Sequence, residues 1–344
     1  MSSQPIVILP MKHLLASLLL VFLSRWTVVA ADAVSELAGF SIFDKVDVNE
    51  LAKSDVKTMP GPPMGGRFLS VQSCYVVPGA PEKHIEALRQ WDPTKHRELK
   101  VFLHSDLPAS PSASNFSKLK DAPDNASVRA LVAATQKLSP ELQISKDEAK
   151  KFSGGGGSGA MPASVANFWS EVLAVRTKKF ASGGTSAQPP YDHGGEVIRP
   201  GDEFNSLLKQ QEKIRRQFSS FLGGTGIGRG AGSLAPELYW ELLDVEDQGV
   251  LTLGASYHRG ASGGAQQAAD ALYYASGGYY VVLTLYQMWP VTANGKPSTL
   301  VWRGDMISSA ALVSLHGVER LGSESAMRKD ISKAVTAFRK DTTR

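Results

Sequence analysis

Arg303 and Asp305 are the two charged residues whose spacing is most suggestive of a site, because they flank one residue in a strand-like segment. Strand alternation places Val301, Arg303 and Asp305 on one face and Trp302 on the other. The polar-out rule for antiparallel sheets favours a solvated outer face for the charged pair. If the pair points inward instead, it needs polar partners, because an unpaired buried charge is costly. Glu241, His258 and Tyr286 on other predicted strands could supply them, and a site from distant strands could also include His104. The candidate ligand-cavity or polar cluster is therefore His104, His258, Tyr286, Arg303 and Asp305.

The sequence contains short matches to motifs of catalysis and cofactor binding, but each lacks the flanking elements or partner motifs that it requires. The glycine-rich run 224–230 follows a predicted helix and precedes a loop, whereas a dinucleotide fingerprint needs a strand before it and a helix after it. Two Ser-x-x-Lys spacings, at 54–57 and 117–120, lack the partner motifs of penicillin-interacting enzymes. The histidines show no local metal-ligand spacing. We therefore predict no catalytic residue, no metal site and no cofactor.

Charge and cysteine content exclude further classes. The 344 residues carry 37 basic and 33 acidic side chains, a formal net charge of +4. Two of the basic residues lie within residues 1–30, so the remainder is nearly neutral, which argues against nucleic-acid binding. A single cysteine, Cys74, excludes a disulfide framework. Its strand-like surroundings predict a buried small hydrophobic residue rather than a reactive thiol.

The N-terminal segment resembles a secretory signal peptide. Lys12 precedes an apolar stretch over 14–23 in which only Ser17 is polar, and small residues follow near Ala30. The stretch is shorter than the about 20 residues of a membrane-spanning helix. We expect residues 1–30 to be a cleaved signal and the protein to be exported, periplasmic or extracellular, in a Gram-negative bacterium. An uncleaved anchor is the alternative.

Hydrophobic periodicity divides the rest of the chain into an irregular segment and one domain. Residues 31–66 read as irregular because proline and glycine crowd their end. Residues 67–344 read as a single α+β domain, with Gly/Ser-rich linkers in its middle. Its predicted parts are sheet segments over 67–104 and 237–306, a helical insert over 113–222 with linkers at 153–159 and 182–195, a long helix within that insert over 202–222, and a C-terminal helix over 324–340.

The fold class follows from the order of these elements. A mostly antiparallel sheet with one apolar face must cover that face, and the C-terminal helix is the natural cover. Its Met327, Ile331, Val335 and Phe338 recur at helical spacing. This order, over 67–104 and 237–340, is similar to the helix-grip arrangement of START-like and polyketide-cyclase-like proteins, in which a curved sheet wraps a long C-terminal helix. The resemblance is topological and transfers no site residue.

Three functions are compatible with this sequence. The leading hypothesis is a non-enzymatic binding or envelope-associated protein with a cavity for a small apolar or aromatic ligand, which a solid core without a pocket above about 300 Å³ would exclude. Aromatic residues gather in the predicted strands, although core packing explains them as well. The second is a hydrolase that draws on His104, His258, Arg303 and Asp305. The third is contact with an anionic membrane surface through the basic C-terminal helix.

Overall fold

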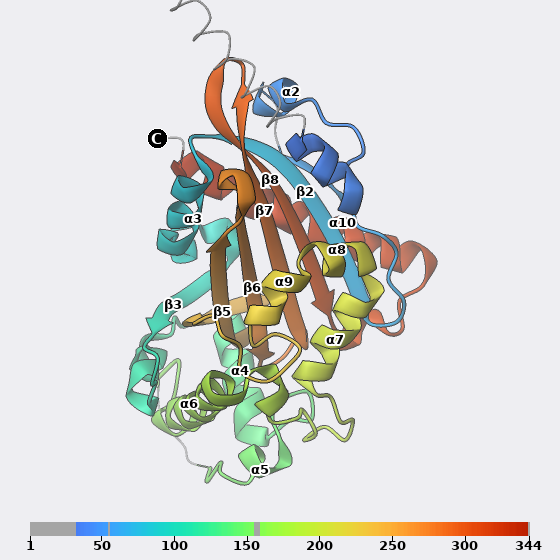
Figure 1. Cartoon of the computed structure of the whole chain (residues 1–344). Coiled ribbons are helices and arrows are strands. Elements are labelled where there is room, and N and C mark those ends of the chain that lie inside the picture. The colour runs from blue at the N-terminus through green and yellow to red at the C-terminus, as the bar shows by residue number, and fades with distance from the viewer. Residues whose placement is uncertain (1–31, 54–55, 155–158, 343–344) are drawn as a thin grey trace, which may run out of the picture.

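The computed structural model describes residues 32–53, 56–154 and 159–342, so the predicted signal peptide lies outside the described residues. Its framework is an antiparallel sheet in the order β1-β2-β8-β7-β6-β5-β4-β3, shown in Figure 1. The predicted α+β class with an antiparallel sheet is confirmed. The strands are β1 (Lys57–Pro60), β2 (Phe68–Pro78), β3 (Val101–Leu107), β4 (Glu237–Val245), β5 (Gln248–Gly260), β6 (Gln266–Ala275), β7 (Val281–Ala293) and β8 (Lys296–Ser308).

Tight turns connect the strands of the meander. Asn294 and Gly295 join β7 to β8 with φ values of 49° and 74°, the left-handed conformation that a two-residue hairpin turn requires. Glu246 and Asp247 join β4 to β5 with φ values of 50° and 63°. These turns fix the register of β7 with β8 and of β4 with β5. The other edge of β8 pairs with β2.

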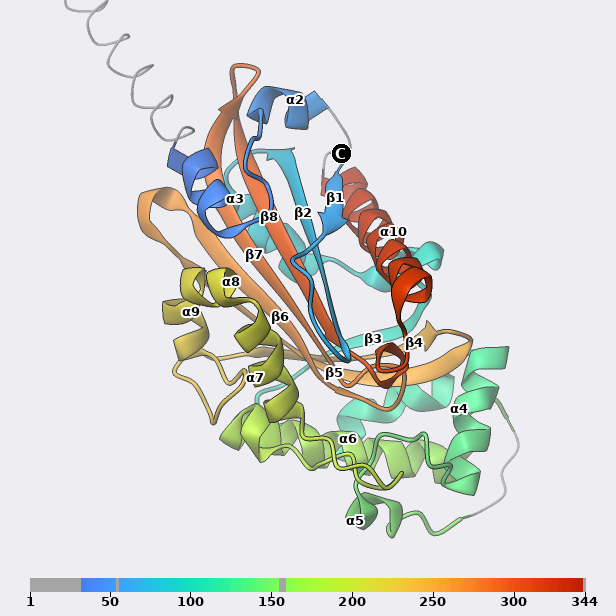
Figure 2. The same ribbon diagram turned by 90° about the vertical axis from the view of Figure 1, so that its right-hand side faces the viewer.

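Helices cover both faces of this sheet, and Figure 2 shows α10 on one side and α7, α8 and α9 on the other. The helix α10 (Gly317–Thr342) contacts β1 and β2, and α3 (Pro81–Gln90) contacts β6, β7 and β8. The predicted C-terminal helix over 324–340 is therefore present and begins earlier, at Gly317. Arg320 holds this early part, because its guanidinium donates to the carbonyls of Met64, Gly66 and Phe68. Short 3-10 turns η1 (Pro93–Lys95), η2 (Arg97–Leu99), η5 (Ser262–Gly264) and η6 (Ala310–Leu312) complete these connections.

The opposite face carries the predicted helical insert. One hydrophobic cluster joins these helices to the sheet, through buried side chains such as Phe204 and Phe218 on the helices and Trp302 on β8. The insert therefore shares the core of the sheet. Its elements are η3 (Ala113–Asp121), α4 (Ala126–Lys137), α5 (Lys146–Ala149), α6 (Ala163–Gly183), η4 (Thr185–Ala187), α7 (Pro200–Gln210), α8 (Glu212–Gln217) and α9 (Ser219–Gly224).

The structure corrects the prediction of one long helix over 202–222. The segment is three helices, because the backbone leaves helical geometry at Gln211, with φ −117° and ψ 59°, and at Phe218, with φ −98° and ψ 6°. The buried amide of Gln211 donates to the carbonyl of Pro62 and to the hydroxyl of Ser70. Tertiary hydrogen bonds thus outweigh the local helical preference at this position.

Two segments expected to be irregular or loose are ordered. Residues 32–40 are helical, and α2 (Val48–Lys53) and β1 follow, because Phe40 and Phe43 are buried against the sheet. In the linker predicted over 182–195, the amide of Thr185 donates to the carbonyl of Gly226, and Tyr191 pairs with Ile198. Part of the other predicted linker, 153–159, lies outside the described residues.

Candidate functional site

A cavity of about 510 Å³ lies between the sheet and the helices α3 and α10. We call it the sheet–helix cavity. Its two walls differ in chemistry, because the sheet contributes charged, hydroxyl and aromatic side chains whereas the helices contribute mainly aliphatic ones. Besides the charged residues Arg89 and Asp330, the helical wall contains Ile85, Leu88, Met327, Ile331, Ala334, Val335 and Phe338. The stripe predicted on the C-terminal helix therefore faces the sheet across this space.

The five residues of the predicted polar cluster all line the sheet–helix cavity: His104, His258, Tyr286, Arg303 and Asp305. Alternation places Arg303 and Asp305 on the same face, as expected, but the solvated outer face favoured by the polar-out rule is wrong. The side chain of Arg303 is 17% exposed and that of Asp305 is 4% exposed. The reason is that α3 and α10 cover this face, so its polar residues look into an enclosed space.

Arg303 and Asp305 form a tight ion pair on β8. The Nε of Arg303 donates to both carboxylate oxygens of Asp305 at 3.0 and 2.8 Å, and Nη2 donates to Oδ1 at 2.7 Å. Thr284 on β7 donates to the same carboxylate at 2.9 Å. Burial lowers the pKa of Arg303, but the adjacent Asp305 outweighs this effect and raises it well above its usual value. The guanidinium also lies 5.5 Å from the ring centroid of Tyr286, the partner expected from the sequence.

Tyr239 and Asp270 form a second polar pair, which sequence reasoning missed. The hydroxyl of Tyr239 on β4 donates to Oδ1 of Asp270 on β6 at 2.7 Å, across the intervening strand β5. Gly254 makes this possible, because a Cβ at that position would lie 2.0 Å from the ring of Tyr239. Burial raises the pKa of Asp270 to about 6, and the nearby Glu241 adds to this rise. The available signal was an acidic residue between alanines within a predicted strand.

The two histidines each pair with their own carboxylate rather than with Arg303 and Asp305. His104 Nδ1 lies 3.1 Å from Glu241 Oε1, and the His104 pKa is raised because this carboxylate outweighs the effect of burial. His258 Nε2 lies 3.6 Å from Glu237 Oε1 at the more exposed rim, where Arg89 also binds Glu237 at 2.6 Å. Glu241, which the sequence offered as a partner for Arg303, therefore pairs with His104 instead.

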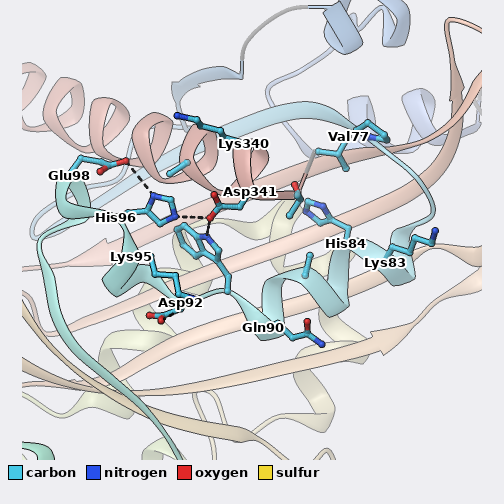
Figure 3. A pocket seen from close by; sticks show the side chains of 15 residues that line it. Val77, Lys83, His84, Gln90, Asp92, Lys95, His96, Glu98, Lys340 and Asp341 are labelled. Atoms are coloured by element: carbon cyan, nitrogen blue, oxygen red, sulfur yellow. Dashed lines mark hydrogen bonds and ion pairs between the residues drawn. The ribbon is translucent and has the colours of Figure 1, made fainter. Parts of the chain in front are cut away.

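A second, more open pocket of about 760 Å³ adjoins the cavity at the C-terminal end of α10, and Trp91 lines both. Figure 3 shows His96 between Glu98 and Asp341 in this pocket. Asp341 accepts hydrogen bonds from Nε2 of His96 at 2.7 Å and from Nε1 of Trp91 at 3.1 Å. These bonds tie the end of α10 to the segment after α3.

The described residues contain no cluster of three or more side chains suited to a metal ion. Within the same part of the chain, no helix combines the length and the apolar character needed to cross a membrane. Cys74 is buried on β2, and burial raises its pKa to about 12, so its thiol is a core group as expected.

Searches of protein-family models, curated proteins and solved structures find no match to the chain.

Proposed function

We propose that the protein binds a small amphipathic molecule in the sheet–helix cavity. The observation that carries this proposal is the cavity itself, about 510 Å³ in volume, with an aliphatic wall from two helices and a polar, aromatic wall from the sheet. Small-molecule sites are concave, are lined mainly by apolar groups and contain a few placed polar groups. The volume lies within the roughly 300–1,000 Å³ typical of such sites.

Binding is favoured over catalysis by the way the polar side chains are paired. Arg303 and Asp305 satisfy each other, and His104 and His258 each face a glutamate. A hydrolase would need a nucleophile within hydrogen-bond reach of a base. Of the four residues considered for a hydrolase, only Arg303 and Asp305 come within hydrogen-bond distance of each other. We therefore keep hydrolysis as the weaker alternative.

Membrane association through α10 is the other alternative. Its apolar stripe lines the cavity and packs towards the sheet, which leaves it less apolar surface for a bilayer. Val318 and Leu321 at the start of the helix are 83% and 63% exposed, and they are the observation that keeps this alternative open. Export of the protein, proposed from the N-terminal pattern, would place the binding site in the periplasm or outside the cell.

The test is saturable binding of a neutral fluorescent probe, N-phenyl-naphthylamine, to the purified protein. We expect one site per chain and an emission increase, because the probe leaves water for an apolar wall. Ala334→Trp on the helical wall fills the cavity and should weaken probe binding at least about tenfold. Thr336→Trp, on the exposed side of the same helix, is the matched control and should leave binding unchanged. Absence of saturable binding, or equal binding by a folded Ala334→Trp variant, would exclude the cavity as the site.

A further inference from the structure

The charged side chains along the sheet–helix cavity are mostly paired with opposite charges. Arg303 binds Asp305, Arg89 binds Glu237, and His104 lies against Glu241. The lining includes no lysine. An anionic ligand would therefore have to take Arg303 away from Asp305, which leaves a buried carboxylate without its partner.

Asp270 is the exception among these groups. It lies at the centre of the sheet wall, opposite Ser256 on β5 and Thr284 on β7, and it keeps some accessible surface because it faces the cavity. Within the described chain, no lysine, arginine or histidine side chain forms an ion pair with it. The hydroxyls of Tyr239 and Ser256 that donate to it are neutral, and Arg303, whose positive charge lowers the Asp270 pKa, is itself bound to Asp305. The part of the cavity around Asp270 thus has acceptor capacity and negative charge in excess of the cations around it.

We propose that the ligand carries a cationic nitrogen that lies against Asp270, with its apolar part against the helical wall. This inference rests on the proposed binding function and names the ligand class: an amphipathic organic cation, such as a protonated long-chain amine. Aromatic side chains suit the same charge, because Tyr239 lines this part of the cavity and aromatic rings attract cations. A cationic group would also compensate the buried carboxylate, whose pKa is raised to about 6 mainly by burial.

A neutral ligand with a hydroxyl group is the rival interpretation. Such a ligand would form a hydrogen bond with protonated Asp270, and the negative charge of the ionised carboxylate would add little to its affinity. The two interpretations differ in their pH dependence, since a cation needs the carboxylate ionised. The other titratable or polar groups that line the cavity with Asp270 are Tyr75 from β2, His104 and Asp106 from β3, Glu237, Tyr239 and Glu241 from β4, Ser256, Tyr257 and His258 from β5, Tyr279 between β6 and β7, Thr284 and Tyr286 from β7, Arg303 and Asp305 from β8, Arg89 from α3 and Asp330 from α10.

Three probes with the same ten-carbon chain separate these possibilities: decylamine, decanol and decanoate. Each is titrated by calorimetry into the full chain below its micelle concentration, at about pH 7.5, where decylamine is protonated and decanoate is ionised. We expect decylammonium to bind at least about tenfold tighter than decanol, and decanoate to bind most weakly. Asp270→Asn should reduce decylammonium affinity to the level of decanol and should leave decanol unchanged. Asp121→Asn, at an exposed carboxylate on η3 outside the cavity lining, is the matched control and should change none of these affinities.

A pH series on the unmodified protein gives a second readout that needs no variant. Lowering the pH from about 7.5 to about 5 protonates Asp270 and should weaken decylammonium binding several-fold, while decanol binding stays constant. Equal affinity for amine and alcohol, together with no effect of Asp270→Asn, would overturn the cation assignment and leave the binding function intact. Failure of all three probes and of the naphthylamine probe would instead overturn the binding function itself.

Discussion

Trp302 and Arg303 are adjacent in the chain, yet the pleat of β8 places them on opposite faces of the sheet and in opposite environments. Trp302 is fully buried, with ring centroids of Phe40 and Phe218 at 4.8 and 5.7 Å. Arg303 looks into a cavity of about 510 Å³. One face of the sheet therefore stabilises the fold by packing, and the other leaves space that a ligand can use.

The difference follows from how the helices are supported. On the closed face, α6 to α9 and residues 32–53 contribute side chains to one continuous cluster with the sheet. On the cavity face, α10 contacts β1 and β2 at one edge, and α3 contacts β6, β7 and β8. Between these two sets of contacts, the helices and the sheet enclose the sheet–helix cavity. Space between a helix and a curved sheet thus arises from where the helix is anchored.

A matched pair of leucine truncations should give the largest difference between the faces. Leu283 on β7 is fully buried on the closed face, whereas Leu272 on β6 lines the cavity. Leu283→Ala should lower the free energy of unfolding by about 4 kcal/mol, because it creates a new void in a packed core. Leu272→Ala enlarges an existing space and should cost about 1 kcal/mol. Urea unfolding at equilibrium measures both, and equal losses would contradict the distinction between the faces.

On the cavity face, substitutions that leave a charge without its partner should lower the free energy of unfolding more than substitutions that only remove apolar contacts. Asp305→Ala leaves Arg303 without its carboxylate in a space where its side chain is 17% exposed, and should cost about 3 kcal/mol. Replacing both residues, as Arg303→Met with Asp305→Leu, should recover most of this loss, because an apolar pair of similar size needs no counter-charge. A double variant as unstable as Asp305→Ala would show that the pair contributes through shape instead.

The sequence predicted the elements that depend on local periodicity. The strand around Arg303 and the helix stripe through Ile331 follow from repeats of two and 3.6 residues, which neighbouring residues set. It missed the break at Gln211 and the helix over 32–40, because buried tertiary contacts impose both. In the candidate site, alternation correctly joined Arg303 to Asp305.

Properties that depend on cross-strand register were out of reach of sequence reasoning. The Tyr239–Asp270 bond spans three strands and requires Gly254 between them, so it exists only once the register is fixed. The choice of Glu241 as the partner of His104 has the same origin, since the two residues are opposite each other in the pairing of β3 with β4. The burial of Arg303 depends on where α10 lies, and strand alternation carries no information about that.

The smallest effect that we expect is a pH-dependent change in the free energy of unfolding when Asp270 is replaced. It distinguishes a carboxylate that contributes to ligand binding from one that stabilises the fold. Burial raises the pKa of Asp270 from its ordinary value of 3.8 to about 6, so the folded protein binds this proton more tightly than the unfolded chain. Stability attributable to Asp270 is therefore present below about pH 4 and is lost as the pH rises through about 6. Asp270→Asn keeps an acceptor for Tyr239 and removes the buried charge. It should therefore raise the free energy of unfolding at pH 8 by about 2 kcal/mol, and by nothing at pH 4.

The measurement is the difference between variant and unmodified protein in urea unfolding across this pH range. His84 titrates in the opposite sense, because burial lowers its pKa to about 4, but its contribution is common to both proteins and cancels in the difference. A variant less stable at pH 8 would mean that the Asp270 carboxylate stabilises the fold, as Asp305 does. If Asp270→Asn is more stable at pH 8 and no longer binds the amine, the carboxylate destabilises the fold and contributes to ligand binding instead.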